Sequence, residues 1–223
     1  MKNSTLILAL LVLSALSVAA ADRTSALLPE GIKGRILLRM PASKTPDRIE
    51  LIAYYPFNEG SYKDESGNKN HGSPKAGAKL GPDRNGMSAG AAYFTKNSSH
   101  MQIDSQKILE KIEDPDNEFT ITLWVKMRSL PQGIMYPGPF NFSRCRRPIG
   151  SNAASLIRNP FEYCLYIFPD GTISADKFLG FGKTFVGTRT LEQKVTPNKW
   201  AHISCVFRNG GHEIYLNGVR ESR

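Results

Sequence analysis

Cysteine is scarce in this chain, with three residues among 223. A scaffold stapled by disulfides is therefore excluded, and the lack of any Cys-x-x-Cys pair excludes a zinc knuckle or a thioredoxin-like site. The four histidines form no His-Glu-x-x-His pattern, which a helical zinc site would need. These residues therefore give no indication of cofactor chemistry.

Acidic residues are outnumbered, because 29 lysines and arginines against 20 aspartates and glutamates leave a net charge of +9. This balance excludes an acidic disordered tail and leaves room for anionic partners. The sequence contains no recognisable RNA-binding or DNA-binding module, so we do not expect nucleic acid among those partners.

Long apolar runs are missing except near the N-terminus, where Leu6–Val18 follow Lys2 and precede three alanines. The run is shorter than the roughly 20 residues of a membrane-spanning helix, and small residues before Asp22 suit a signal peptidase. Residues 1–21 therefore predict a signal peptide. The mature chain is expected to be secreted, in an extracellular or periplasmic location, with no membrane span. An uncleaved signal anchor is the alternative.

Residues 22–48 carry three prolines and one short apolar run, Ile36–Leu38, which is typical of a linker with room for one strand. Residues 49–223 form the predicted domain, in which short β-branched and aromatic runs alternate with turn clusters. In residues 119–127 every second side chain is apolar, which predicts a strand with one core face. Turn residues predict hairpins around Gly171 and around residues 208–211.

Several motifs occur in the order found in one family. They include Leu51-Ile-Ala-Tyr-Tyr-Pro-Phe-Asn58, Asp64-Glu-Ser-Gly-Asn-Lys-Asn-His-Gly72 and Ile214-Tyr-Leu-Asn-Gly-Val219. The chain resembles the laminin-G-like domain of the concanavalin A-like lectin/glucanase superfamily, in its bacterial secreted form. This resemblance implies an all-β fold, an antiparallel two-sheet jelly-roll sandwich.

Two departures from the family pattern are visible. Residues 95–100 replace a segment that usually contains carboxylates. The family also continues past Asn217-Gly218 through further strands, whereas this sequence stops at Arg223. We therefore expect a sandwich that lacks its last strands, as in a truncated product.

No group of residues predicts catalysis. Gly86-Met-Ser-Ala-Gly90 matches the pattern of a serine hydrolase elbow, but a turn precedes it and a strand follows it, so a glycine-rich strand entry is the better interpretation. Asp114-Pro-Asp-Asn-Glu118 has the spacing of a glycosidase carboxylate set but lies in a predicted loop. We therefore expect no enzyme.

Calcium is the candidate ion, because jelly rolls of this kind often hold one. Asp64, Asn68 and Asn70 are the candidate ligands, since their side chains offer oxygen atoms. The alternative is a turn in which these side chains bond to nearby backbone groups.

The cysteines allow two pairings that the sequence leaves open. A disulfide between Cys145 and Cys164 is the first prediction, and it makes Cys205 a buried free thiol because Cys205 alternates with apolar residues. A pair between Cys164 and Cys205 is the alternative and requires neighbouring strands.

A basic loop is the candidate ligand site. Arg144, Arg146 and Arg147 lie close in sequence to Tyr136, so guanidinium groups and an aromatic ring could stack on sugars and pair with sulfate or carboxylate. A solvated basic loop without a ligand is the alternative.

Together these features predict a secreted, non-catalytic binding module for carbohydrate, an acidic polysaccharide included, or for a protein partner. A glycoside hydrolase of the same superfamily is the second hypothesis. A truncated structural or adhesive fragment without a ligand is the third. The sequence does not determine the oligomeric state.

Overall fold

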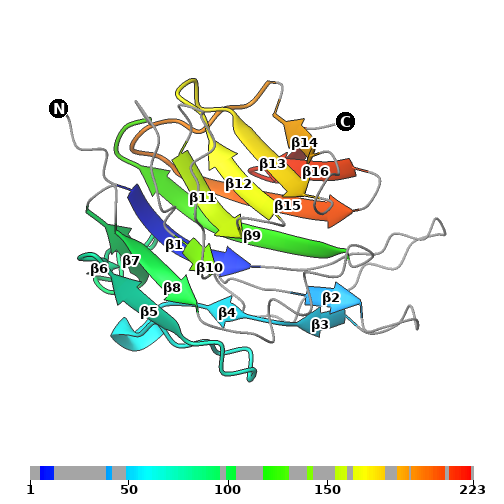
Figure 1. The fold of residues 1–223 in the computed structure, drawn as a ribbon. Helices are drawn as coiled ribbons and strands as arrows, with labels where there is room; N and C mark the ends of the chain where they lie inside the picture. The colour runs from blue at the N-terminus through cyan, green and yellow to red at the C-terminus, as the bar shows by residue number, and fades with distance from the viewer. Residues whose placement is uncertain are drawn as a thin grey trace.

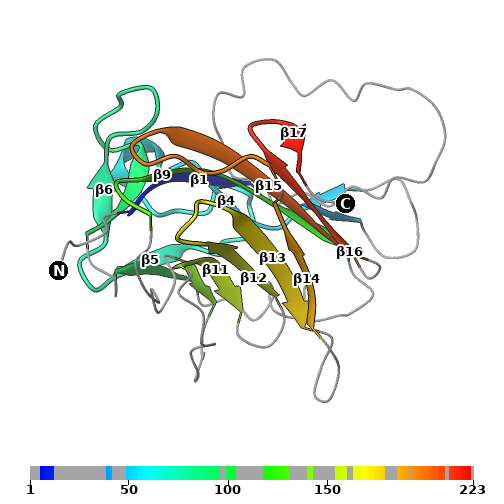
Figure 2. The same cartoon turned by 90° about the horizontal axis from the view of Figure 1, so that it is seen from above.

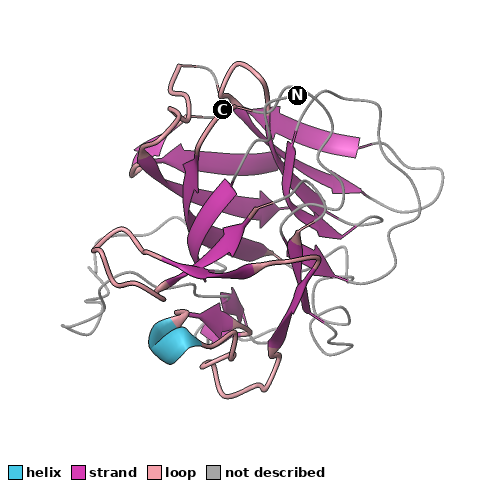
Figure 3. Ribbon diagram, turned by 90° about the vertical axis from the view of Figure 1, so that its left-hand side faces the viewer, coloured by secondary structure: helices cyan, strands magenta, loops and turns pink. Residues whose placement is uncertain are grey.

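The computed structural model describes residues 6–12, 39–41, 49–95, 99–103, 118–130, 140–142, 154–159, 163–178, 185–190, 192–208 and 211–221. Within these ranges the chain is built from β-strands, with one short 3-10 turn, η1 (Asn58–Gly60) (Figure 3). The strands form two sheets stacked as two layers (Figure 2). The predicted all-β sandwich is confirmed.

The first sheet has ten strands among the described residues and carries the longest ones. Its main path, from one edge to the other, is β17 (Val219–Arg220), β16 (Gly211–Leu216), β15 (Trp200–Arg208), β9 (Phe119–Met127), β1 (Leu6–Val12), β7 (Ala91–Phe94) and β6 (Lys79–Gly81). Three short strands lie off this path: β2 (Arg39–Pro41), β3 (Ile49–Leu51) and β4 (Tyr54–Tyr55). Every strand pair in this sheet is antiparallel.

The second sheet has seven strands among the described residues. Its order is β14 (Phe185–Arg189), β13 (Ile173–Phe178), β12 (Tyr163–Ile167), β11 (Ala154–Asn159), β10 (Phe140–Phe142), β8 (His100–Ile103) and β5 (Gly72–Lys75) (Figure 1). The sheet differs from the fully antiparallel expectation at β10, which runs parallel to both β8 and β11. A parallel neighbour cannot follow through a tight hairpin, so the chain reaches β10 through longer connections on both sides.

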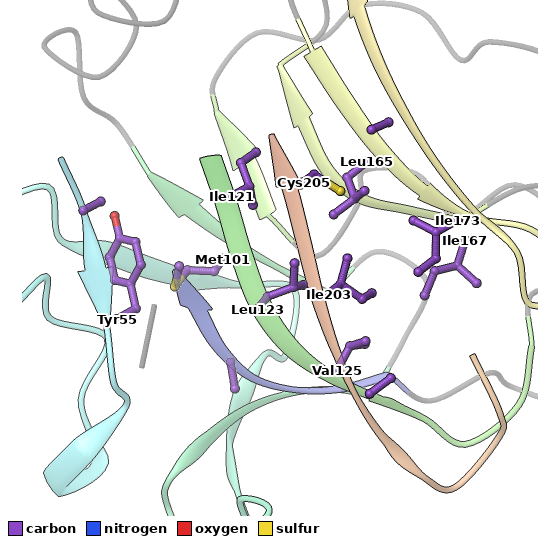
Figure 4. Close-up of a cluster of buried hydrophobic side chains, with 14 of the residues drawn as sticks. Tyr55, Met101, Ile121, Leu123, Val125, Leu165, Ile167, Ile173, Ile203 and Cys205 are labelled. Carbon is purple, nitrogen blue, oxygen red and sulfur yellow. The ribbon is translucent and has the colours of Figure 1, made fainter. Parts of the chain in front are cut away.

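The core lies between the two sheets, and β9 contributes most regularly to it. Phe119, Ile121, Leu123, Val125 and Met127 are all fully buried, which confirms the predicted core face. On the opposite face Thr120 and Thr122 are buried as well, and only Trp124 and Lys126 are partly exposed. Figure 4 shows side chains of β9 and β15 directed toward those of β12 and β13, among them Leu165, Ile167 and Ile173.

Both predicted hairpins are confirmed. β12 and β13 pair around a turn in which Gly171 has a φ of 83°, a conformation that favours glycine. A Cβ at Gly171 would also meet the carbonyl oxygen of Val195 at 2.6 Å. β15 and β16 pair from Ile203 opposite Leu216 to Arg208 opposite Gly211.

Leu6–Val12, the first part of the apolar run in the predicted signal peptide, form β1 in this structure. β1 lies inside the first sheet, antiparallel to β9 on one side and to β7 on the other (Figure 1). The signal peptide itself stays a prediction. The structure shows where Leu6–Val12 lie when the leader is retained.

No helix among the described residues is long and apolar enough to cross a membrane. The helical turn suggested by residues 105–113 and the apolar run of residues 36–38 lie outside the described residues.

Cys205 is buried in the core and is free, as expected. Its neighbours in Figure 4 are aliphatic side chains, and burial raises the pKa of its thiol well above the usual value. The pairing of Cys164 with Cys205 is therefore wrong for this structure. Cys145 lies outside the described residues, so the disulfide between Cys145 and Cys164 stays a prediction.

We predict that Cys205 resists alkylation in the folded protein, because iodoacetamide reacts with an exposed thiolate. Peptide mass spectrometry should find label on Cys205 only when denaturant is present during the reaction. Rapid labelling of Cys205 in native buffer would contradict its burial.

Candidate functional site

The predicted ligand residues cannot be placed, because Tyr136, Arg144, Arg146 and Arg147 all lie outside the described residues. The loop that carries them therefore stays a prediction. The described surface offers two other places to look for a site, the turn around Asp64 and the outer face of the first sheet.

The structure brings the predicted calcium ligands together in one turn. Asp64 is buried, and its carboxylate accepts hydrogen bonds from the backbone N–H groups of Tyr54, Ser66 and Asn70 at 2.8–2.9 Å. The hydroxyl of Ser66 donates a fourth bond to the same carboxylate at 2.8 Å. Four donors thus surround this carboxylate, which holds the turn closed.

The two asparagines of the turn use their amide nitrogens as donors. Asn68 donates to the carbonyl oxygens of Leu51 and Ile52 at 2.6 and 3.0 Å, and Asn70 donates to Ile52 at 2.8 Å. The alternative of a local Asx-type turn fits Asp64, which accepts the N–H of Ser66 two residues on, but the asparagines instead bond to a segment 16–18 residues away. The calcium site stays a prediction. If calcium binds in this turn, adding millimolar calcium to chelator-treated protein should raise its melting temperature. An unchanged melting temperature would contradict the predicted calcium site.

We predict that Asp64→Asn lowers the free energy of unfolding by about 3 kcal/mol. The substitution removes a charged acceptor and places an amide donor against backbone donors in a buried position. Urea denaturation measures the change. Glu65→Gln, at the exposed neighbouring position, is the control and should shift stability by less than about 0.5 kcal/mol. Equal effects of the two substitutions would contradict this account of the turn.

The outer face of the first sheet carries aromatic rings beside cations. Strand alternation puts Trp124 and Lys126 of β9, Trp200 and His202 of β15, and Tyr93 of β7 on this face, opposite to the buried core residues. Trp124 and Trp200 are only partly buried, so part of each ring reaches the surface. We call these residues, together with Lys79, Arg84 and Arg128, the aromatic–cation face.

Each of its three large rings has a cation above it. The Arg84 guanidinium lies 4.7 Å from the ring centroid of Trp124, and the Lys126 ammonium lies 6.0 Å from that of Trp200. Lys79 and Arg128 lie 5.7 and 5.5 Å from the Tyr93 ring. These distances are within the range in which a ring face attracts a cation.

Strand pairing fixes the spacing of these groups. Trp124 stands opposite His202 in the β9–β15 ladder, and their ring centroids are 5.0 Å apart. Trp200 stands opposite Lys126 two residues further along the same ladder. The backbone of His202 is bound by Asn217, whose side-chain oxygen accepts its N–H at 3.0 Å. The β9–β15 ladder therefore positions Trp124, Lys126, Trp200 and His202, whereas Arg84 comes from a turn.

Charges at the other end of the same strands are paired. Arg208 lies 2.6 Å from Glu213 and 3.6 Å from Glu118, and Arg220 lies 3.5 Å from Glu213. The Tyr215 hydroxyl also donates to Glu213, at 2.7 Å. The two ends of this outer face therefore differ, since carboxylates and arginines neutralise each other at one end and cations cover aromatic rings at the other.

The structure describes one of the two motifs considered for catalysis in full and only the last residue of the other. Residues 86–90 form a turn that leads directly into strand β7, with Asp83 accepting from the backbone of Asn85 and Met87. This confirms the interpretation as a strand entry. Of the acidic segment 114–118, only Glu118 lies within the described residues, and it pairs with Arg208.

The aromatic–cation face was missed in the sequence because no single segment carries it. Alternation already placed Trp124 and Lys126 on the face opposite the core. The contact from Arg84 to Trp124 joins residues 40 positions apart, and it needs the order of the strands, which the sequence does not supply.

We predict that His202 makes the fold less stable as the pH falls below about 6.5. Burial, and then the nearby charge of Arg84, lower the pKa of His202, so the folded protein takes up a proton less readily than the unfolded chain. Stability is therefore full above the unfolded pKa and decreases below it. Thermal unfolding of His202→Gln between pH 7 and 5 should show a flatter pH dependence than the native protein.

Comparison with known proteins gave one match. The family model described as the concanavalin A-like lectin/glucanases superfamily matches residues 95–223, more than half of the chain. A search of curated proteins and a search of solved structures found no match. The matched region contains β9, β15 and β16, which carry most of the outer face. The match supports a binding or carbohydrate-related module.

Proposed function

Because the chain belongs to the concanavalin A-like lectin/glucanase superfamily, we propose that it is a secreted, non-catalytic module that binds an anionic carbohydrate on the aromatic–cation face. The observation that carries this proposal is the set of three large rings, Tyr93, Trp124 and Trp200, each with a cation above it. Binding on a sheet surface needs no activated acid, base or nucleophile.

The aromatic rings supply the apolar part of such a site. When a ligand binds, the side chains of Arg84 and Lys126 move from the ring faces to its anionic groups. The C–H faces of its sugar rings then pack against Trp124 and Trp200, which lie on neighbouring strands. Both strands belong to a packed sheet, so little ordering is required when a ligand binds. A flat polysaccharide chain fits such a surface better than a small compact ligand does.

The cations supply the charge preference. Arg84, Lys126, Arg128 and Lys79 surround the rings, and an arginine can bind a carboxylate or sulfate through two parallel hydrogen bonds. The net charge of +9 adds a long-range attraction for anionic chains. This favours a uronic acid or sulfated polysaccharide over a neutral one.

The described carboxylates at the other end of this face support binding over hydrolysis. Glycoside hydrolysis requires two carboxyl groups that flank the scissile bond, one of them able to donate a proton. Glu118 and Glu213 instead share Arg208 as an ion-pair partner. Hydrolysis remains the second hypothesis, and an assay for released reducing ends tests it directly.

We predict that the protein binds alginate or chondroitin sulfate but not dextran, and that Trp124→Ala weakens this binding about tenfold. The expected loss corresponds to one ring contact together with its cation. Arg84→Gln should also weaken binding and should reduce its dependence on salt. Affinity electrophoresis or calorimetry at two salt concentrations measures both effects.

Phe168→Ala is the matched control, because Phe168 also lies under a cation, Arg189 at 4.0 Å, but follows β12 in the turn that joins two strands of the other sheet. Each variant should first show an unchanged melting temperature. Binding that is insensitive to Trp124→Ala and Arg84→Gln would exclude this face. Release of reducing ends from a bound polysaccharide would show that the protein is a hydrolase and would contradict the proposed non-catalytic function.

A further inference from the structure

β1 and β2 lie end to end along the same side of β9. β1 pairs with β9 from Leu6 opposite Met127 to Val12 opposite Thr122. β2 pairs with it at Arg39 opposite Thr120, two residues further along. Both strands run antiparallel to β9, so a chain that extends β2 backward from Arg39 would enter the place that β1 occupies.

A strand is needed in that place, because it lies between β9 and β7 and pairs with both. Leu6 stands opposite Met127 and Phe94, and Leu8 stands opposite Val125 and Ala92. These four partners in β7 and β9 are buried. Without a strand here, backbone groups of β7 and β9 would lose their partners and these core residues would face water. Cleavage before Asp22, as the leader prediction requires, removes β1.

We propose that in the processed chain residues 32–38 extend β2 along β9 and take the place of β1. This inference rests on the proposed leader and is independent of the proposed ligand. The slot is defined by described residues of β7 and β9, and its new occupant comes from the same chain. β1 would then occupy this position only before cleavage, and residues 32–38 would occupy it afterwards.

The sequence of this segment fits the register set by Arg39 opposite Thr120. Continued backward, that register puts Leu38 opposite Ile121, Ile36 opposite Leu123, Gly34 opposite Val125 and Ile32 opposite Met127. These four partners are fully buried, and the residues facing them are apolar or glycine. A strand that fills this slot needs that alternation.

The intervening residues match the outer face. Leu37 would stand opposite Thr122, which is buried and suits an apolar partner. Arg35 and Lys33 would stand opposite Trp124 and Lys126, which are partly exposed. Arg35 would thus add a cation beside Trp124, whereas Lys33 meets a like charge at Lys126 and makes that end the weaker one. β1 offers no such alternation, since all seven of its residues are apolar.

The experiment compares two forms of the full chain, one exported and processed, the other expressed without export so that the leader is retained. Intact mass identifies each form, and hydrogen exchange followed by mass spectrometry reports on the backbone. In the processed form, amides of residues 34–38 should exchange about 100-fold or more slowly than in an unstructured chain. In the unprocessed form, protection should fall on residues 6–12 instead.

Two substitutions test the predicted faces. In the processed form, Ile36→Asp should lower the melting temperature by about 10 °C, because it buries an unpaired charge, whereas Arg35→Asp, opposite the partly exposed Trp124, should lower it far less. In the unprocessed form both should have small effects. A processed chain that folds with residues 32–38 unprotected, one that does not fold, or an exported chain that keeps residues 1–21 would each overturn the proposal.

Discussion

The pairing of β9 with β15 is the constraint on which the rest of the described structure depends. The ladder runs without a break from Trp200 opposite Lys126 to Phe207 opposite Phe119. Its inner side buries two stacked phenylalanine rings whose centroids are 4.7 Å apart. Because a strand sends successive side chains to opposite sides, the same ladder that fixes the core also fixes the outer rings. Core packing and surface recognition therefore cannot vary independently in these two strands.

The sequence predicted the parts of the fold that are governed by local periodicity and turn chemistry. Residues 119–127 alternate cleanly, and Gly171 closes a hairpin as glycine turns do, so both features followed from short segments. The strand formed by Leu6–Val12 did not follow, since a run that is apolar at every position reads as a leader or a buried strand with equal ease. The parallel placement of β10 depends on contacts distant in sequence, which no local pattern encodes.

The candidate site also has one part that the local sequence predicted and one part that depends on contacts distant in sequence. The turn from Asp64 to Asn70 was identified from its residue types, and the structure adds which atoms donate and which accept. The outer face needed strand order, because Arg84 and Trp124 meet only through the fold. Arginines clustered in sequence drew attention to the loop around Arg144–Arg147, whereas the cations of the sheet are scattered and become a cluster only in space.

The turn around Asp64 also supplies hydrogen bonds to backbone groups that a neighbouring strand would otherwise bind. Between β3 and β4, the carbonyl oxygens of Leu51 and Ile52 receive side-chain amides, and the Tyr54 carbonyl receives the N–H of Glu65 at 2.8 Å. The Tyr54 N–H is taken by Asp64 itself. These backbone groups could otherwise pair with a strand of another molecule. Because the turn already occupies them, this part of the sandwich is protected against edge-to-edge aggregation without an additional strand.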